Sequence, residues 1–258
     1  MADYAFLLDL GRCIGCQACV ASCKVGNELG EGQQYVQLIE KTHGEFPKLT
    51  GGWNNHRCYH CADAACVTVC PTGALYKEDG LTRLDRSVCS GCSYCTEACP
   101  YQVPVMWEGK SSKCDGCAAT VAAGGEPWCV RTCPSDALMY GPREEIRAEA
   151  HRRAEVLRER YPNAQVYGET QAGGLGMLVV APDDPQLLDI PLDPKTPFMA
   201  DMWQKVVQPS AVALTLGAAV LAGVGGVIAR RRHQEELVVL EAEEMIEGDA
   251  TDTNQEEG

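Results

Sequence analysis

The sequence predicts an α+β fold in which bound metal stabilises a cysteine-rich N-terminal half and one helix near the C-terminus crosses a membrane. Three observations predict it. The 258 residues include 16 cysteines, all of them between Cys13 and Cys133. That region offers only short strand-like pieces, such as the stretch YAFLLD from Tyr4, so metal ligation must supply much of its folding free energy. Residues 206–229 contain no charged side chain.

The cysteines fall into four tight groups. Their even number allows a disulfide framework, but gaps of two and three residues favour ligation of one centre over crosslinks between distant segments. The start, MADYAFLLDLGRC, also lacks the basic region and apolar core of a secretory signal. A zinc site is the alternative for a single CxxC pair, yet every group has further cysteines close by. The groups are Cys13, Cys16, Cys19 and Cys23; Cys58, Cys61, Cys66 and Cys70; Cys89, Cys92, Cys95 and Cys99; and Cys114, Cys117, Cys129 and Cys133.

Three of the four groups end in Cys-Pro, and the pattern CxxCxxCxxxCP is the run found in bacterial ferredoxins. In that run the first three thiolates hold one 4Fe-4S cluster and the fourth holds a second cluster. We therefore expect the cofactors to be four 4Fe-4S clusters, held by two interlocked bacterial-ferredoxin-like modules. No cysteine is left over for catalysis, so we predict no catalytic residue, and an open iron site for a substrate is disfavoured.

Because the fourth cysteine crosses between clusters, the groups must be paired. The second and third groups are joined by TGALYKEDGLTRLDRSV, which looks like the turn and strand between the halves of a two-cluster ferredoxin; the first and fourth then pair around them. Sequential pairing, one with two and three with four, is the alternative. The nested assignment gives Cys13, Cys16, Cys19 and Cys133 (site one); Cys58, Cys61, Cys66 and Cys99 (site two); Cys89, Cys92, Cys95 and Cys70 (site three); and Cys114, Cys117, Cys129 and Cys23 (site four).

The predicted organisation follows from these sites. A four-cluster domain covers residues 1–140, with module one at about 1–45 and 105–140 and module two at about 46–104. Residues 141–181 form a helix and strand extension. Within it, apolar residues at Ile146, Ala150, Ala154 and Leu157 predict an amphipathic helix over 142–161, and MLVVA predicts a short buried strand. Five prolines between Pro182 and Pro197 predict an extended arm over 182–202. Its apolar residues (Leu187, Leu188, Ile190 and Leu192) lie either on this domain or on a partner subunit.

The uncharged run is long enough to cross a bilayer. Its 24 residues span about 36 Å as a helix, against a hydrocarbon core of about 30 Å. We predict a transmembrane helix over 203–229, with Trp203 and Lys205 at one interface and Arg230, Arg231 and Arg232 at the other. An acidic tail follows over 230–258. Basic residues stay on the cytoplasmic side, which predicts a single-pass protein of the bacterial cytoplasmic membrane with a cytoplasmic tail and a cluster domain on the periplasmic face.

Other functions and residues are weaker candidates. A net charge of −14 without a basic surface excludes nucleic acid as an expected partner, and the chain has no CxxCH motif for covalent haem. His60, between two cysteines, is expected to be a loop histidine in contact with solvent rather than a residue that tunes a cluster. Four lysines near the cysteines are likewise expected to be ordinary solvated side chains: Lys24, Lys77, Lys110 and Lys113.

The order and spacing of all four groups resemble the iron–sulfur subunits of the complex iron–sulfur molybdoenzyme family. The stretch KCDGCAATVAAGGEPWCVRTCPSDALMYG, the charged helix, VYGETQAGGLGMLVV, the proline-rich arm and the terminal span are similar to the β subunits of respiratory formate dehydrogenases. The resemblance implies nested pairing and transfer of electrons between a molybdenum or tungsten catalytic subunit, which holds the bisPGD cofactor, and a membrane cytochrome b subunit that reacts with quinone. It also implies export of the folded domain together with a catalytic subunit that carries a twin-arginine signal. The alternatives are the electron-transfer subunit of a membrane-bound hydrogenase or of another molybdoenzyme reductase.

Overall fold

The computed structural model describes residues 3–198, 202 and 206–252, with side chains described through Gln234 except at 208, 209, 211 and 212. It divides into two compact units, Met1–Asp201 and Met202–Gly258. The first unit contains all sixteen cysteines.

A four-stranded sheet in the first unit joins residues from its beginning and its end. The strand order is β8-β1-β10-β9. The central strand β1 (Tyr4–Asp9) pairs in parallel with β10 (Met177–Ala181) and antiparallel with β8 (Leu138–Pro142), while β9 (Gln165–Tyr167) borders β10. The strand predicted from MLVVA is therefore β10, and every one of its residues is buried.

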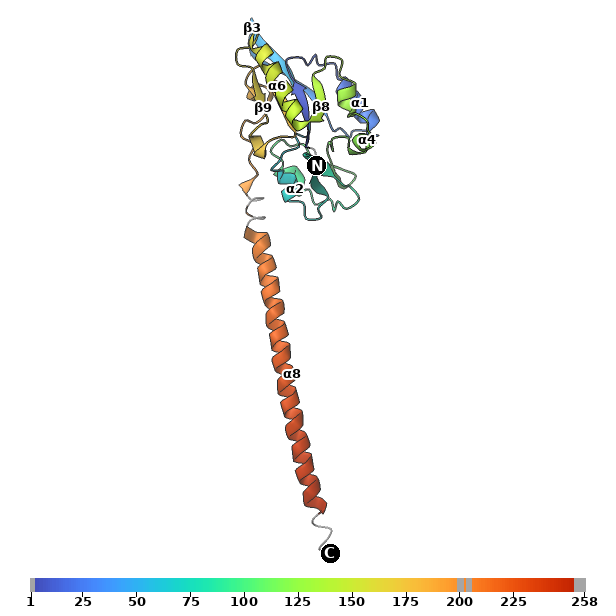
Figure 1. Cartoon of the computed structure of the whole chain (residues 1–258), viewed down its shortest axis with the longest axis vertical. Helices are drawn as coiled ribbons and strands as arrows, with labels where there is room; N and C mark the ends of the chain where they lie inside the picture. The colour runs from blue at the N-terminus through green and yellow to red at the C-terminus, as the bar shows by residue number, and fades with distance from the viewer. Residues whose placement is uncertain (1–2, 199–201, 203–205, 253–258) are drawn as a thin grey trace. The chain divides into compact units, whose positions relative to one another are not determined.

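The alternating side chains of β1 serve two separate cores. Ala5 and Leu7 pack against the helix α6 (Arg143–Arg158), which presents Ile146 and Ala150 to the sheet and lies beside β8 and β9 in Figure 1. Phe6 and Leu8 point to the opposite face and belong to the core that includes buried cysteines. Because neighbouring residues of a strand point to opposite faces, one short strand attaches the cysteine-rich region to α6.

The cysteine-rich region consists of hairpins and helices of at most nine residues. The helices follow cysteine loops and pack in pairs, α1 with α5 and α2 with α3. Three hairpins lie between them. The elements are α1 (Ala18–Gly26), β2 (Gln37–Glu45), β3 (Lys48–His56), α2 (Ala65–Thr68), β4 (Leu75–Glu78), β5 (Leu81–Leu84), α3 (Tyr94–Ala98), β6 (Val105–Trp107), β7 (Lys110–Ser112), α4 (Ala118–Ala122) and α5 (Trp128–Arg131). Helices this short are marginal without tertiary support, so the packing around the cysteines must stabilise them.

Residues 182–198, the part of the proline-rich arm that the structure describes in the first unit, pack partly on their own domain. Two short 3-10 helices, η1 (Gln171–Gly173) and η2 (Pro185–Leu188), flank β10. Leu188 and Ile190 are buried in the core that contains the cysteines, whereas Leu187 and Leu192 are 36% and 39% exposed. The sequence left open whether the apolar residues of the arm lie on this domain or on a partner subunit. Leu188 and Ile190 lie on this domain.

The second unit contains the helix α8 (Gln208–Asp252), the long helix at the C-terminal end of the chain in Figure 1. Its segment Ala213–Gln234 is long and apolar enough to cross a membrane, with mean hydropathy 1.7 and no residue buried. The helix continues past Arg230 into the acidic segment, where Glu, Leu, Ala and Met are good helix formers. The predicted interface residues Trp203 and Lys205, and the start of the predicted span, lie outside the described residues.

Candidate metal centres

Three cavities of similar size are each lined by four cysteines. Their empty volumes, open solvent included, are about 320, 350 and 310 Å³. The first contains the four cysteines of site one, the second those of site two and the third those of site three. Each cavity takes three cysteines from one group and the fourth from another. These are the sets that the nested assignment predicts as ligands.

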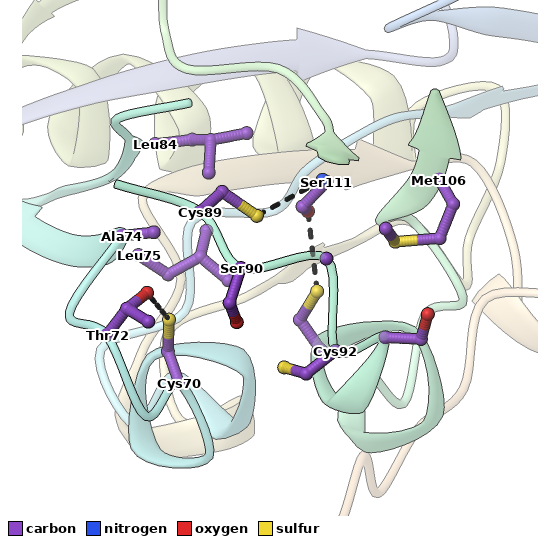
Figure 2. A pocket seen from close by; sticks show the side chains of 13 residues that line it. Cys70, Thr72, Ala74, Leu75, Leu84, Cys89, Ser90, Cys92, Met106 and Ser111 are labelled. Carbon is purple, nitrogen blue, oxygen red and sulfur yellow. Dashed lines mark hydrogen bonds between the residues drawn. The ribbon is translucent and has the colours of Figure 1, made fainter. Parts of the chain in front are cut away.

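The third cavity shows how a site is built. Cys89 and Cys92 come from the loop before α3, and Cys70, which follows α2, faces them across the cavity (Figure 2). Ser111 on β7 closes one side: its backbone N–H lies 3.4 Å from Cys89 Sγ, and its Oγ lies 3.3 Å from Cys95 Sγ. Thr72 Oγ1 is 3.8 Å from Cys70 Sγ. The polar groups that contact Cys70, Cys89 and Cys95 are therefore all uncharged.

The cysteines of site four are all buried. Two polar side chains connect them. Asn27 Nδ2 lies 3.5 Å from Cys23 Sγ and 3.8 Å from Cys117 Sγ, while Arg57 Nη2 lies 3.2 Å from Cys129 Sγ and 3.9 Å from Cys114 Sγ. The pairing of α1 with α5 brings Cys23 and Cys129 to this place.

Burial controls the ionisation of the thiols. It raises the pKa of Cys66 and of Cys114 to about 12, although a neighbouring cation opposes the shift in both. Cys70 is the exception, because backbone N–H groups of Leu75, Thr72 and Ala74 outweigh its partial burial and lower its pKa. Thiolates are the metal-binding form, so filling the buried sites must release protons from most of these thiols.

The four sites are neighbours in one series. Cys19 of site one and Cys23 of site four lie one turn apart on α1. His60, between the site-two cysteines Cys58 and Cys61, lies 3.8 Å from Cys114 Sγ of site four. Sites two and three are joined at Cys66 and Cys95, which share a small apolar core. The series therefore runs one, four, two, three. Only the two sites at its ends contain an exposed cysteine, Cys16 in site one and Cys92 in site three.

His60 does not contact solvent as expected. Its side chain is completely buried. Nδ1 accepts a hydrogen bond of 3.1 Å from the backbone N–H of Thr82, and Nε2 lies 3.8 Å from Cys114 Sγ. Burial, with Lys113 and Arg57 nearby, lowers the pKa of His60 well below its usual value. The expectation of a solvated loop histidine was wrong because strands from elsewhere cover this loop.

The lysines near the cysteines are also more constrained than expected. Lys113 is 1% exposed, and its Nζ donates to the carbonyls of Thr82 and Cys114 at 2.7 Å. Lys77, which is exposed as expected, still bonds the carbonyl of Cys61 at 2.7 Å. Lys24 and Lys110 are partly buried and bond backbone carbonyls as well. Lys113 is therefore a buried cation, which the sequence pattern does not reveal.

Four cysteine loops repeat one backbone feature. In the first CxxC of each group the residue before the second cysteine has a positive φ: Gly15 at 68°, Gly91 at 75°, Gly116 at 75° and His60 at 52°. Glycine adopts this conformation freely, whereas other residues rarely do. Gly116 is also closely packed, because a Cβ there would lie 2.8 Å from Leu81 and 2.9 Å from Arg83. His60 is thus the non-glycine member of a repeated turn.

The residues present fit 4Fe-4S clusters. Each site offers four sulfur donors, which is the ligand set of such a cluster. The described residues contain no group of three or more His, Cys, Asp or Glu side chains placed to hold a single metal ion; four thiols around a cluster lie farther apart than four around one ion. At site four, the buried guanidinium of Arg57 requires an anionic neighbour. Arg57, Asn27 and Ser111 were missed by sequence reasoning, because nothing in the local pattern reveals their burial or contacts.

Comparison with known proteins identifies the domains. Two family models, each described as a 4Fe-4S dicluster domain, match residues 52–143 and residues 12–74. Together they span the sixteen cysteines. The cysteine-rich region therefore consists of 4Fe-4S dicluster domains, in agreement with the predicted cofactor type.

Several curated proteins are similar over a large share of their length. The probable anaerobic dimethyl sulfoxide reductase chain YnfG of Escherichia coli is 41% identical over 56% of this chain and 76% of its own length. The thiosulfate reductase electron transfer subunit PhsB of Salmonella typhi is 43% identical over 55% of this chain and 78% of its own. The formate dehydrogenase iron-sulfur subunit of Haemophilus influenzae is 31% identical over 86% of this chain and 79% of its own. The sixteen cysteines are gathered into four-sulfur sites, and the relatives above are similar over most of their length. The chain therefore belongs to the family of iron–sulfur, electron-transfer subunits of molybdoenzyme complexes.

Proposed function

We propose that the chain holds a 4Fe-4S cluster in each of sites one to four and conducts electrons along the series one, four, two, three. When bound, such clusters accept and release single electrons. The observation that carries the proposal is the placement of four sets of four thiols in one continuous series, with exposed cysteines at its two ends.

The residues of the chain have distinct tasks in this proposal. Site four has only buried thiols, and site two has two buried and two half-buried ones, so the interior of the series is held away from water. Exposed Cys16 and Cys92 mark the places where redox partners can approach the ends. Ile14 and Tyr94, next to these loops, are 65% and 56% exposed and can serve as contact surface for a partner. The chain itself then needs no catalytic residue.

Iron analysis tests the number of clusters. Four filled sites hold about sixteen iron atoms per chain, since each 4Fe-4S cluster contains four. Protein purified without oxygen and reconstituted should approach that value, with matching acid-labile sulfide. A reproducible value near half of it, or stoichiometric zinc, would contradict the four-cluster proposal.

We further propose that the catalytic partner is a formate dehydrogenase subunit with molybdenum or tungsten bound by bisPGD, and that the other partner is a membrane cytochrome b subunit that reacts with quinone. The similarity to a formate dehydrogenase iron-sulfur subunit supports this, because it extends over 86% of the chain, beyond the dicluster domains. The apolar segment of α8 supports attachment to a lipid bilayer. Electrons would then run from formate to quinone.

Deletion of the gene tests the formate proposal. Membranes from the deletion strain should lose formate-driven quinone reduction, and a plasmid copy of the gene should restore it. A plasmid copy carrying Cys117→Ser, which removes one ligand of site four, should fail to restore the rate. If formate-driven reduction survives deletion while hydrogen-driven reduction is lost, the chain serves a hydrogenase.

A second candidate is the electron-transfer subunit of a sulfoxide or thiosulfate reductase. The identities of 41% and 43% over the dicluster region favour it. In that case electrons would run from quinol to the catalytic subunit. The same deletion strain separates the two candidates: loss of quinol-dependent dimethyl sulfoxide or thiosulfate reduction, with formate oxidation unchanged, would identify the reductase.

A further inference from the structure

The loop that carries Cys58 and Cys61 contributes side chains to two sites. Its cysteines line site two. Two other residues of the same loop, Arg57 and His60, contact the sulfur atoms of site four instead, Arg57 at Cys129 and Cys114 and His60 at Cys114. Both side chains are buried, with exposed fractions of 1% and 0%. The loop therefore links the two interior members of the series.

Arg57 carries a positive charge that no carboxylate balances. In the part of the chain that the structure describes, no ion pair includes it. Its Nε and Nη1 find no hydrogen-bond partner among the described residues, and its guanidinium lies 5.3 Å from the ring centre of Phe6. A cation removed from water in this way is costly unless an anion lies beside it. The sulfur atoms of site four are the acceptors that its Nη2 reaches.

His60 is held in an unusual conformation that directs it to the same site. It has the positive φ that the other three loops give to glycine, and such a conformation costs free energy in a residue with a side chain. Its Nδ1 accepts from the Thr82 N–H, so its ring proton is on Nε2, which faces Cys114 Sγ at 3.8 Å. His60 is thus a hydrogen-bond donor to a sulfur atom of site four.

At sites one and three, the two ends of the series, no contact among the described residues places a cation within hydrogen-bond distance of a sulfur atom. Asn55 Nδ2 lies 3.6 Å from Cys19 Sγ at site one, and Ser111 supplies neutral groups at site three. A charged donor forms a stronger hydrogen bond than a neutral donor, and the difference grows where water is excluded. Site four is therefore electrostatically distinct from the ends of the series.

We propose that Arg57, assisted by His60, stabilises the reduced state of the cluster at site four and so raises its midpoint potential. A 4Fe-4S cluster with four thiolates is anionic, and it gains further negative charge on reduction. A buried cation next to two of the sulfur atoms lowers the free energy of the reduced form more than that of the oxidised form. Arg57 and His60 are positioning residues in this proposal, which rests on the ligand sets proposed above.

Redox titration of the intact complex, followed by electron paramagnetic resonance, tests the inference. Arg57→Gln should lower the midpoint potential of the site-four cluster most. The site-one cluster should shift less, because the charge of Arg57 also acts on Cys19, and the site-three cluster should be unchanged. The signal with the largest shift should be the one that Cys117→Ser also alters. Arg57→Lys, which retains the charge, should recover most of the shift. His60→Gly, which introduces the residue of the other three loops, should lower the same potential by a smaller amount.

Arg131→Gln is the matched control. Arg131 is exposed and lies only two positions from Cys129, so the substitution removes the same charge from the same neighbourhood. Water screens an exposed charge, and the four potentials should stay at their wild-type values. Equal shifts in Arg57→Gln and Arg131→Gln, or no shift in either, would overturn the role of the buried cation.

Loss of a cluster is also an informative outcome. If Arg57→Gln protein lacks the site-four cluster but Arg57→Lys protein retains it, the charge is required and the inference holds. If both variants lack it, shape rather than charge is responsible and the inference is wrong. Absence of a site-four signal in the wild-type complex would instead contradict the proposed ligand set, which separates the two failures.

Discussion

Cys133 shows how much a single residue can decide about the sites. It lines the same cavity as Cys13, Cys16 and Cys19, far from them in the sequence. Sequential pairing would place a cysteine of the second group there instead. The cavity supports nested pairing, and ligation by Cys133 stays a prediction until a variant is measured.

We expect Cys133→Ser to disturb the cluster at site one alone, because serine is a poorer ligand than a thiolate for iron in these clusters. The iron content should fall by at most about one cluster, or four atoms per chain, and the site-two signal should be unchanged in electron paramagnetic resonance spectra. Ser135→Ala is the control, since Ser135 Oγ lies 3.8 Å from Cys133 Sγ without being a predicted ligand. A change confined to the cluster of the Cys89 group would favour sequential pairing.

At the scale of elements, α6 is tied to the sheet by a buried ion network. Arg153 Nη1 lies 3.4 Å from Asp9 Oδ2 and donates to the carbonyl of Asp136 at 2.7 Å, and its Nε bonds Glu149 at 2.6 Å. Asp9 ends β1 and also accepts from the backbone N–H of Gly11. The network therefore fixes the turn that leads into site one.

Arg153→Met should destabilise the domain by about 3 kcal/mol, because it leaves the buried Asp9 with only the partly exposed Arg12 as its cation. Arg152→Met is the matched control: Arg152 bonds the same Glu149, but its side chain is 58% exposed, so its loss should cost about 1 kcal/mol or less. Urea titration without oxygen, followed by the visible absorption of the clusters, measures both. Equal shifts of the urea midpoints in the two variants would show that the buried Arg153–Asp9 pair adds nothing to the stability of the domain.

At the scale of the whole molecule, the orientation of the apolar segment decides on which side of the membrane the dicluster domains work. Arg230, Arg231 and Arg232 lie near the end of the segment that the structure marks as able to span, Ala213–Gln234. Basic residues next to a span favour the cytoplasmic side. We therefore propose a cytoplasmic tail and a cluster domain on the periplasmic face.

A reporter fused after Gly258 tests this orientation. A reporter that is active only in the cytoplasm should be active there, and one that is active only outside should be silent. The pair of reporters fused after Phe198, ahead of the apolar segment, should give the opposite pattern when the catalytic partner is co-expressed. Activity of the Gly258 fusion only outside the cytoplasm would mean that the orientation is inverted.

The sequence by itself determined the features that depend on local spacing. Cysteines two and three residues apart predict the type of cluster, and the dicluster family matches agree with it. A continuous apolar run predicts the buried strand β10. Helical periodicity predicts α6, because apolar residues three and four positions apart lie on one face of a helix. An uncharged apolar run likewise predicts the segment able to span a membrane.

Only the tertiary structure decided which residues from distant segments meet. It favoured the predicted nested pairing over the sequential alternative by placing Cys133 beside Cys13. It also arranged the sites in the series one, four, two, three, and buried Arg57, His60 and Lys113 among the sulfur atoms. The physical reason is that burial of a side chain in irregular, cysteine-rich segments depends on the strands and loops that cover it. Burial of this kind leaves no recognisable pattern in the sequence. The spacing of ligands within one loop, in contrast, can be read directly from the sequence.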